Sequence, residues 1–505
     1  MVKTTLFRSG SALTVCLALA LLPVTGCAPA IPRKTAPAKD APGISASASC
    51  ANFLNCTAAA YERTGKVSDQ IRLYSEAIAA WTTADGAKNL SLAYANRGIS
   101  LYASSKYGDS IKDFGKALEL DPDYTAAYYN RGLAYHSSGN YSKAAEDFTS
   151  AISSGMDYPF VYRLRGIAKL NSEDYSGAIE DFNAAALSGE PDALLYRNRA
   201  AARYALKDCA GAAEDYSVAL LLDRTGDCGS GTPGAVFADR GAAYYCLKDY
   251  DRAIDDHTEA KRLDPRNART LYGRAAAYKK KGDMASAAGD LEQAVILDPE
   301  YADAYVSLGN LHRKKKEYEL AISYYNKALA LPGQKKDVIY NNRGLTHYCA
   351  RDYDKAIADF SSAAAANPAN AKAYVNRAMA KCQAGNCREA LPDCEKALKI
   401  DPGYSAGYGV RGYVNYELGD YSRAEEDFKK TVELSPSNWD ALFGLALVSE
   451  RSGEFAAADA WIKKAMELEP GIKKGAAFLE GLESEGYFYT PGQKETLLAL
   501  IGRNS

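Results

Sequence analysis

The residues of this chain that could do chemistry at a regular spacing are nine arginines, each followed sixteen residues later by an aspartate. The arginines are Arg97, Arg131, Arg165, Arg199, Arg240, Arg274, Arg343, Arg377 and Arg411. The aspartates are Asp113, Asp147, Asp181, Asp215, Asp256, Asp290, Asp359, Asp393 and Asp427. A guanidinium group can bind a carboxylate through two parallel hydrogen bonds, or it can bind an anionic ligand. The spacing therefore allows nine internal ion pairs or a groove lined by cationic side chains.

The two positions change together along the chain. Three further copies of the surrounding pattern lack both charges, and they carry Thr57 with Leu73, Leu308 with Tyr324, and Leu445 with Trp461. Pairing with the following copy would leave Asp290 opposite Leu308. We therefore predict an ion pair within each copy, joining two helices. Because such a pair already neutralises the Arg, these residues are predicted to be mainly architectural rather than anion-binding.

The elements that carry these residues follow a period of 34 residues. Twelve units fit this period, at 51–84, 91–124, 125–158, 159–192, 193–226, 234–267, 268–301, 302–335, 337–370, 371–404, 405–438 and 439–472. A small residue such as Gly132 allows two helices to approach, and Ala144 and Phe148 supply packing residues on the second helix. A proline such as Pro122 cannot continue that helix. Each unit is therefore predicted to be a pair of helices.

The Asn-Arg-Gly sequences at residues 96–98, 130–132 and 342–344, together with these small, aromatic and proline positions, resemble the tetratricopeptide repeat. The resemblance covers residues 51–472 and implies an all-α fold. In this fold, about twelve helix pairs stack into an α-solenoid that winds as a right-handed superhelix. Each repeat buries its apolar face only against its neighbours.

The ends and interruptions of the solenoid can be placed on the sequence. The first unit, 51–84, is degenerate, as a terminal repeat should be, and short insertions interrupt the register near residues 85–90 and 227–233. Apolar helical spacing within residues 473–505 predicts helices that cap the open end. No separate catalytic domain fits in what remains of the 505 residues.

The N-terminus resembles a bacterial lipoprotein signal. Lys3 and Arg8 precede an apolar stretch, and the segment ends in Val-Thr-Gly before Cys27. The resemblance implies a signal peptide at 1–26, acylation of Cys27, and a disordered Pro-rich and Ala-rich tether over 27–50. We therefore expect an exported protein of the cell envelope, held by a lipid anchor. The outer membrane facing the periplasm is favoured if the organism is Gram-negative.

The resemblance also implies which side chains meet a ligand. In this family the first helix of each repeat lines the concave face, and the residue before the Arg points into it. That position carries Asn96, Asn130, Asn198, Asn342 and Asn376. Six residues further along lie Tyr102, Tyr204, Tyr245, Tyr348 and Tyr416. Amide and tyrosine side chains suit an extended peptide or a protein hot spot. The alternative is that the Asn is simply a solvated part of the Asn-Arg-Gly signature.

A cluster of positive charge, which we call the basic edge, ends the first helices of two consecutive repeats. It consists of Lys279, Lys280, Lys281, Arg313, Lys314, Lys315 and Lys316. Such a patch could meet an acidic partner, an anionic glycan or lipid head groups. Cations at a helix C-terminus are also favoured by the helix dipole without any ligand.

Other motifs predict no cofactor, metal site or nucleic-acid partner. A glycine-rich stretch at 229–234 lacks the preceding strand of a dinucleotide site, and His257 takes a core slot. Basic and acidic residues number 61 and 63, which gives no case for nucleic acid. Among the cysteines, the core slots of Cys209, Cys387 and Cys394 predict buried thiols, and the disulfide candidates are Cys50 with Cys56 and Cys349 with Cys382.

The sequence thus predicts a non-catalytic scaffold or adaptor that binds proteins or extended peptides of the bacterial cell envelope, mainly through its concave face. An alternative is a carbohydrate-associated subunit of a polysaccharide export or cell-wall synthesis complex. An enzyme is not expected, because the chain shows no combination of acid, base, nucleophile or metal ligands.

Overall fold

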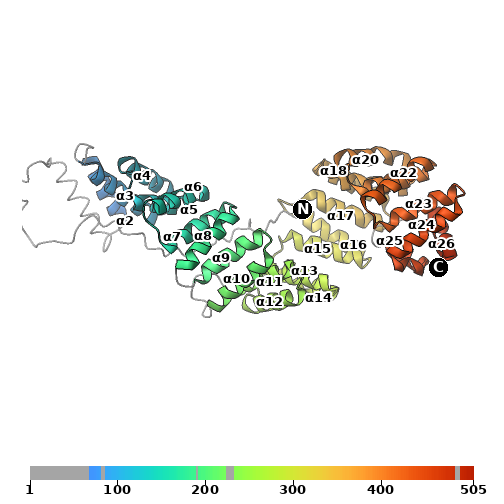
Figure 1. The fold of residues 1–505 in the computed structure, drawn as a ribbon, viewed down its shortest axis with the longest axis horizontal. Helices are drawn as coiled ribbons and strands as arrows, with labels where there is room; N and C mark the ends of the chain where they lie inside the picture. The colour runs from blue at the N-terminus through green and yellow to red at the C-terminus, as the bar shows by residue number, and fades with distance from the viewer. Residues whose placement is uncertain (1–66, 81–85, 189–191, 223–232, 484–488, 505) are drawn as a thin grey trace, which may run out of the picture. The chain divides into compact units, whose positions relative to one another are not determined.

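The structure is a computed structural model that describes residues 67–80, 86–188, 192–222, 233–483 and 489–504 (Figure 1). Within these ranges the chain forms 25 α-helices and one short 3-10 helix, and it contains no β-strand. The expectation of an all-α fold is confirmed. None of the helices in the described ranges has the length and apolar character needed to cross a membrane.

The first helices of successive repeats begin with the second unit. They are α3 (Ala87–Ala103), α5 (Thr125–Ser137), α7 (Pro159–Asn171), α9 (Ala193–Ala205), α11 (Pro233–Cys246), α13 (Ala268–Lys281), α15 (Ala302–Lys314), α17 (Lys336–Cys349), α19 (Ala371–Gln383), α21 (Ser405–Glu417) and α23 (Trp439–Arg451). Residues 51–66, which would supply the first helix of the first repeat, lie outside the described ranges.

The second helices alternate with these. They are α2 (Val67–Ala80), α4 (Tyr107–Leu120), α6 (Tyr141–Ser153), α8 (Tyr175–Ser188), α10 (Cys209–Leu222), α12 (Tyr250–Leu263), α14 (Met284–Leu297), α16 (Tyr318–Ala330), α18 (Tyr353–Ala366), α20 (Cys387–Ile400), α22 (Tyr421–Leu434) and α24 (Phe455–Leu468). After them come the 3-10 helix η2 (Pro470–Lys474), α25 (Ala476–Glu483) and α26 (Pro491–Asn504). The last two lie in the segment predicted to cap the solenoid.

The sequence sets the helix boundaries through capping residues. Asp283 begins α14 by accepting a hydrogen bond from the backbone N–H of Ser286, and Asp420 does the same for Arg423 at α22. These acceptors satisfy donors that have no partner inside the helix. Between the two helices of a repeat the chain turns through a left-handed residue, such as Gly282 with φ 85°.

A glycine of the first helix and an aromatic ring of the second bring the two helices of a repeat together. A Cβ atom added at Gly132 would stand 2.9 Å from the ring of Phe148, closer than packed atoms allow. Where this slot holds Ala275, the facing core residue is Leu291, which is smaller than an aromatic ring. In these two repeats the size of the first-helix residue and the volume of the facing core residue compensate for each other.

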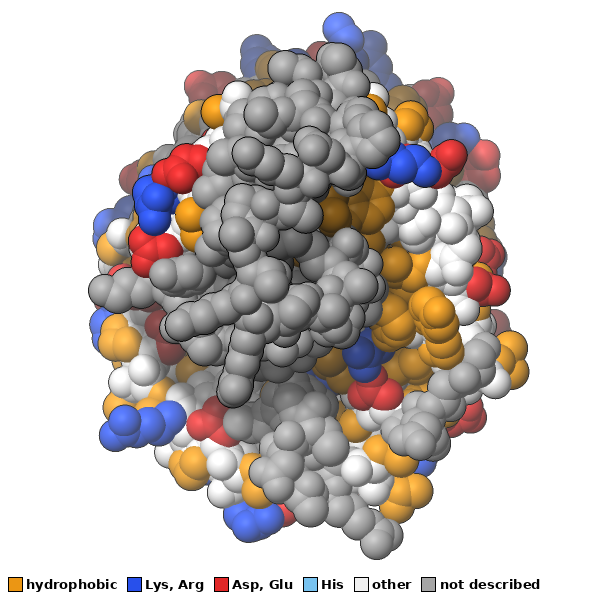
Figure 2. Space-filling model, turned by 90° about the vertical axis from the view of Figure 1, so that its left-hand side faces the viewer, with side chains coloured by type: hydrophobic (Ala, Val, Ile, Leu, Met, Phe, Trp, Pro, Cys, Tyr) orange, Lys and Arg blue, Asp and Glu red, His pale blue; other side chains and the backbone are white. Residues whose placement is uncertain are grey.

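The chain divides into two compact units, residues 1–265 and 266–505. Within each unit, the helices of a repeat pack against each other, and the second helix of one repeat packs on the first helix of the next. Each unit is thus an α-solenoid, as expected from the repeat pattern. On the face drawn in Figure 2, basic and acidic side chains are interspersed among those that are coloured, in keeping with totals of 61 and 63.

The interruptions differ in part from expectation. Most of the insertion near residues 85–90 is helical, because α3 begins at Ala87 and includes its last four residues. The insertion at 227–233 falls outside the described ranges except for Pro233, which begins α11. The signal peptide, Cys27 and the tether also lie outside them.

Candidate functional site

Each of the nine arginines binds the Asp of its own repeat through two hydrogen bonds, from Nε and Nη2 to the two carboxylate oxygens. The eighteen distances lie between 2.5 and 3.0 Å. The Arg side chains are 13–28% exposed and the Asp side chains 4–8% exposed. These are half-buried bidentate pairs that join the two helices of one repeat.

The same arginines also reach the preceding repeat, which the sequence analysis did not anticipate. In several repeats Nη1 donates to a polar side chain on the preceding second helix, for example from Arg199 to Asn183 at 2.8 Å and from Arg377 to Ser361 at 3.1 Å. An aromatic ring three residues earlier lies against the guanidinium, as Tyr196 does for Arg199. One Arg therefore links its own repeat to its neighbour.

Three of the Asp residues bind a second cation that sequence reasoning missed. Asp181 also contacts Lys169 at 3.0 Å, Asp215 contacts Arg203 at 3.0 Å, and Asp393 contacts Lys381 at 2.9 Å. Each extra cation stands four residues after the pairing Arg, one helical turn further along the same face. That spacing is visible in the sequence and could have indicated the contact.

The charge state of these pairs follows from their contacts. Hydrogen bonding to Asp147 raises the pKa of Arg131 above its usual value, against the opposing effect of burial. The guanidinium therefore stays charged at every pH at which the fold persists. A row of arginines already bound in this way is not a row of free anion-binding groups.

Four of the five Asn residues predicted to line the concave face have little exposed surface. Asn96, Asn130, Asn198 and Asn376 are buried. Only Asn342 is half-exposed.

The reason for this burial is the packing between consecutive first helices. The side chain of Asn376 donates to Asn341 of the preceding repeat at 2.7 Å, so its amide contributes to the joint between two repeats. Among the described residues, both side-chain polar atoms of Asn130 are buried without a hydrogen-bond partner. The amide of Asn130 therefore does not form such a bond across the joint.

The five tyrosines of the predicted concave face are also packing residues to a large extent. Tyr348 and Tyr416, both predicted to meet a ligand, are buried. The remaining three, Tyr102, Tyr204 and Tyr245, are half-buried. The Tyr102 hydroxyl forms a 2.9 Å hydrogen bond with Ser137 of the next repeat. These rings bridge one repeat and the next, and they expose only part of their surface.

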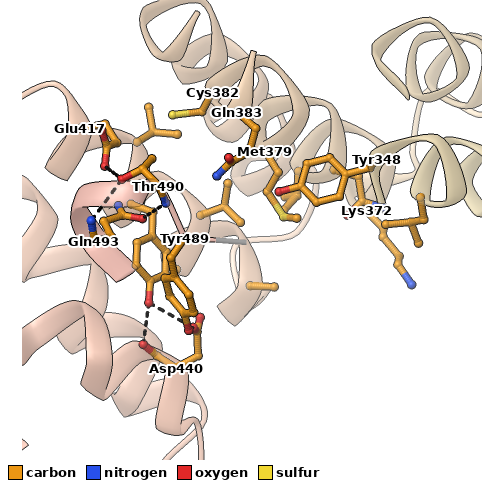
Figure 3. Close-up of a pocket in the computed structure, with 18 of the residues that line it drawn as sticks. Tyr348, Lys372, Met379, Cys382, Gln383, Glu417, Asp440, Tyr489, Thr490 and Gln493 are labelled. Atoms are coloured by element: carbon orange, nitrogen blue, oxygen red, sulfur yellow. Dashed lines mark hydrogen bonds between the residues drawn. The ribbon is translucent and has the colours of Figure 1, made fainter. Parts of the chain in front are cut away.

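A pocket of about 320 Å³ lies along the first helices α17, α19, α21 and α23 and the start of α26 (Figure 3). Leu345, Met379 and Val410 supply an apolar wall, and Lys372 and Gln383 stand among its polar lining residues. Of the ten side chains expected to meet a ligand, Tyr348 and Asn376 line it. The pocket therefore occupies the first-helix face that the repeat pattern indicates, but through mostly different residues.

The segment before α26 closes one end of this pocket. Tyr489 donates a short hydrogen bond to Asp440, and Tyr413 donates to the same carboxylate at 3.1 Å. Burial raises the pKa of Asp440 above its usual range, and the two hydroxyl donors oppose that rise. The Thr490 hydroxyl reaches Glu417 at 3.0 Å. These contacts hold the segment before α26 across one end of the pocket.

The local sequence explains why α26 begins directly after Thr490. The Thr490 backbone N–H donates to Gln493 at 2.9 Å, and the Gln493 N–H returns a bond to the Thr490 hydroxyl at 3.4 Å. This reciprocal arrangement, followed by Pro491 at the first helical position, fixes the start of α26. The pocket thus has one end closed by the chain itself.

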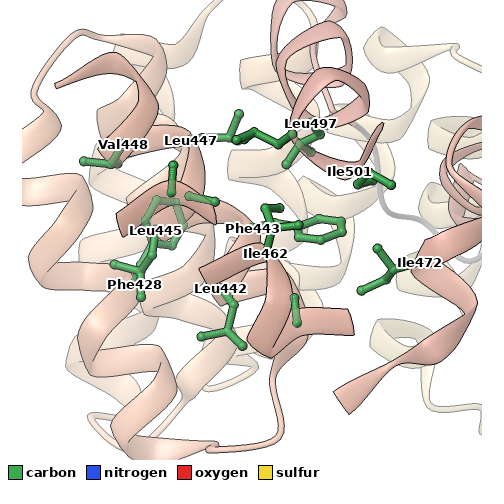
Figure 4. Close-up of a cluster of buried hydrophobic side chains, with 14 of the residues drawn as sticks. Phe428, Leu442, Phe443, Leu445, Leu447, Val448, Ile462, Ile472, Leu497 and Ile501 are labelled. Atoms are coloured by element: carbon green, nitrogen blue, oxygen red, sulfur yellow. The ribbon is translucent and has the colours of Figure 1, made fainter. Parts of the chain in front are cut away.

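The cap is anchored by the largest apolar cluster among the described residues (Figure 4). Leu442 and Phe443 of α23 and Ile462 of α24 pack in it with Leu497 and Ile501 of α26, and all five are 2% exposed or less. Burying such side chains contributes about 1.5–3 kcal/mol each. Because α26 is fixed in this cluster, Tyr489 and Thr490, which directly precede it in the chain, are also held in position.

The basic edge lies on the same unit as the pocket, at the end of α13, at the end of α15 and in the turn after α15. Its lysines are exposed and Arg313 is half-buried. Burial, followed by the neighbouring charges of Lys280 and Lys314, lowers the pKa of Lys279. These cations are close enough to repel one another.

The structure corrects part of the cysteine interpretation. Cys209 is bonded to Cys246, and Cys382 to Cys387, so Cys209 and Cys387 are not free thiols and Cys349 is not bonded to Cys382. The physical reason is that Cys382 and Cys387 flank one tight turn, with Cα atoms 3.9 Å apart. Cys349 and Cys394 are buried free thiols, and Cys50 and Cys56 lie outside the described ranges.

The described residues hold no group of three or more His, Cys, Asp or Glu side chains that could bind a metal ion. His257 is buried and faces Gly241 in the core slot that Phe fills elsewhere. Of the glycine-rich stretch at 229–234, only Pro233 and Gly234 are described, and they begin α11.

Comparison with protein families gives matches to tetratricopeptide repeat models over parts of the predicted repeat region. The model described as TPR repeat matches residues 98–139, and models described as tetratricopeptide repeat match 125–154, 272–335, 341–405 and 410–471.

The chain is also similar to several solved structures. A tetratricopeptide repeat protein from Parabacteroides merdae is 19% identical, with 54% of this chain and 97% of that chain covered and a TM-score of 0.41. Yeast Tom70 is 16% identical, with 86% and 95% covered and a TM-score of 0.40. YrrB, described as a TPR protein with an unusual peptide-binding site, is 22% identical, with 39% and 96% covered and a TM-score of 0.32. From the family matches and the paired helices, the chain is a tetratricopeptide repeat protein.

Proposed function

We propose that this chain is a scaffold of the bacterial cell envelope that binds an extended segment of a partner protein in the pocket along α17, α19, α21 and α23. The observation that carries the proposal is the pocket itself, whose lining combines an apolar wall with scattered polar groups. A volume of about 320 Å³ fits a few side chains, and sites of this composition recognise ligands by burying apolar groups and orienting polar ones.

A peptide is the occupant that this lining fits best. Four successive first helices contribute to the wall, so a bound chain would cross several repeats. Gln383 and Lys372 can bond to main-chain groups, while Met379 can adapt its shape to different apolar side chains. The chemistry needed is recognition, and none of these groups is arranged as an acid–base or nucleophile pair.

The proposed location rests on the sequence of the N-terminus, where Cys27 follows Val-Thr-Gly. Acylation of Cys27 would anchor the chain to a membrane, with the outer membrane favoured in a Gram-negative organism. The test is incorporation of a labelled fatty acid in cells. Label is expected in the wild-type chain and not in Cys27→Ala, and equal labelling of both would reject the anchor.

Partner capture tests the pocket. The mature chain is used to enrich partners from envelope extracts, and the yield of each protein is compared with that from Met379→Trp, whose larger ring fills the pocket. A matched control, Lys396→Trp on the exposed side of α20, adds the same ring elsewhere. A partner lost with Met379→Trp and kept with the control supports the proposal. Equal capture by all three chains would reject the pocket as the binding site.

A glycan-binding subunit is the second candidate, and the basic edge is the observation that favours it. Retention of the purified chain on an anionic polysaccharide, abolished by replacing Lys279, Lys280 and Lys281 with Ala and unaffected by Met379→Trp, would support that role instead.

A further inference from the structure

The basic edge and the pocket belong to one continuous recognition surface. Arg313 and Lys279 occupy the slot of their repeats that Tyr348 occupies in the next one, and Tyr348 lines the pocket. Equivalent slots of stacked repeats lie in a row. The contacts agree, because Lys279 is within electrostatic reach of Lys314, and Arg313 acts on the Cys349 thiol, next to Tyr348.

Two acidic side chains that follow the row closely in the sequence, Asp283 and Glu317, are already engaged. Asp283 caps α14 by accepting from the Ser286 N–H at 3.0 Å. Glu317 is bonded to His312 at 2.5 Å. The exposed charges of Lys279, Lys280 and Lys314 therefore face solvent on one side of the pocket, while Thr490 and Tyr489 close its opposite end.

We propose that the partner segment carries an apolar part, which fills the pocket beside Met379, and an acidic part, which lies over Lys279, Arg313 and Lys314. This inference rests on the function proposed above and names the chemistry of the partner. An apolar segment alone would leave the positive row unmatched, and an acidic segment alone would leave the pocket empty. The segment runs along the first helices, and its apolar part abuts the closed end.

The spacing of the two parts follows from the repeat. From α15 to α19 there are two helix-to-helix steps of about 10 Å each. An extended chain advances about 3.3 Å per residue. The acidic residues over Arg313 and Lys314 are therefore expected roughly six positions from the apolar ones, and those over Lys279, one repeat further, roughly nine positions from them. These separations distinguish this segment from one in which acidic and apolar residues are adjacent.

A displayed library of random 16-residue peptides tests the proposal without knowledge of the partner. The library is selected on the mature chain, and the enriched pool is measured against three variants. Met379→Trp fills the pocket. Lys279→Glu with Lys314→Glu reverses two charges in the row. Lys396→Glu with Lys399→Glu makes the same change in net charge on the exposed side of α20.

Enriched peptides are expected to place Asp or Glu about six and about nine residues from a pair of apolar side chains. Their affinity should fall at least tenfold with the charge reversal in the row, stay within twofold with the control reversal, and fall with added salt. If the enriched peptides are apolar and their affinity is unchanged by Lys279→Glu with Lys314→Glu, this inference is overturned, while the proposed function of the pocket still stands. If the affinity of the enriched peptides is unchanged by Met379→Trp, both this inference and the proposed function of the pocket are overturned. Binding of the row to phosphatidylglycerol vesicles or heparin, with no acidic peptide enriched, would replace the acidic segment by a membrane or a glycan.

Discussion

Removing one arginine should cost very different amounts in two neighbouring repeats. Among the described residues, Arg131 is the one cation that forms an ion pair with Asp147, with both hydrogen bonds at 2.8 Å, and Lys143 acts on this carboxylate only as a charge outside ion-pair distance. Asp181, in contrast, is bound by Arg165 and also by Lys169 at 3.0 Å. Replacing Arg131 by Ala therefore leaves a carboxylate without an ion-pair partner, whereas replacing Arg165 by Ala does not.

The magnitudes follow from burial. The Asp147 side chain is 7% exposed, and breaking a buried pair on one side costs about 3–5 kcal/mol. Since Arg131 itself is 22% exposed, we expect the lower end, about 3 kcal/mol. For Arg165→Ala the remaining Lys169 reduces the loss to about 1–1.5 kcal/mol, the value of lost hydrogen bonds. Arg165 also donates to Thr149 at 3.2 Å, so Arg165→Ala loses this hydrogen bond as well. That further loss narrows the expected difference in stability between the two variants, so a larger cost of Arg131→Ala would be strong evidence for the role of Lys169.

Hydrogen exchange read by mass spectrometry is the suitable assay, because repeat arrays open locally and lack one global unfolding free energy. Amides of α6 should exchange about a hundredfold faster in Arg131→Ala, and those of α8 about tenfold faster in Arg165→Ala. The double change Arg131→Leu with Asp147→Tyr copies Leu308 and Tyr324 and should exchange more slowly than Arg131→Ala. Equal acceleration in the two single variants, or a double variant no better than Arg131→Ala, would refute the reasoning.

Three further predictions concern the core, a buried thiol and the cap. Gly132→Ala sets a Cβ 2.9 Å from the Phe148 ring and should cost about 1–3 kcal/mol of stability by overpacking. Adding Phe148→Leu should restore the protection of α5 against hydrogen exchange. A double variant with amides as poorly protected as those of Gly132→Ala would contradict this. Burial raises the pKa of Cys394 to about 12, so native protein at pH 8 should react with iodoacetamide at least about a hundredfold more slowly at Cys394 than urea-unfolded protein, and similar rates would contradict the burial. Because burial raises the pKa of Asp440, its neutral form favours the fold: Asp440→Asn should slow exchange in α26 at pH 7, and the difference should vanish as the pH falls below about 4, where Asp440 is itself protonated. An Asn variant that exchanges faster by the same factor at both pH values would show that the charge is not the cause.

The repeat architecture and the ion pairs could be predicted because their signals are local and repeated. A period of 34 residues fixes the helix pairs, and the joint loss of Arg and Asp in the repeats with Leu308 and Leu445 indicates the pairing within a repeat. The second cation on Asp181 also has a local signal, since Lys169 follows Arg165 by one helical turn.

The site was less predictable because burial of a first-helix side chain depends on the next repeat. Asn376 and Tyr348 lie on helix faces that point both toward the groove and toward a neighbouring helix, and helical spacing alone does not separate the two directions. The closed end of the pocket comes from Tyr489, 49 residues after the Asp440 that it bonds. Such a contact has no counterpart in the repeated units.

The disulfides were mispredicted for a related reason. Reasoning from core slots treated Cys209 and Cys387 as packing residues, but each stands at the start of a second helix. Cys387 lies across a tight turn from Cys382, and Cys209 meets Cys246 at the end of α11, the first helix of the next repeat. Neither proximity is encoded by slot occupancy, because one depends on the backbone of a turn and the other on how consecutive repeats stack.

The central claim is that the pocket along α17 to α23 holds a partner segment, and photocrosslinking in living cells tests it most directly. A photoreactive residue replaces Lys372, which is exposed and lines the pocket, and in a matched chain it replaces Lys396 on α20. The account predicts a discrete protein adduct from position 372, absent from position 396 and lost when Met379→Trp is added. Adducts of equal yield from both positions, or an adduct from position 372 that survives Met379→Trp, would contradict it.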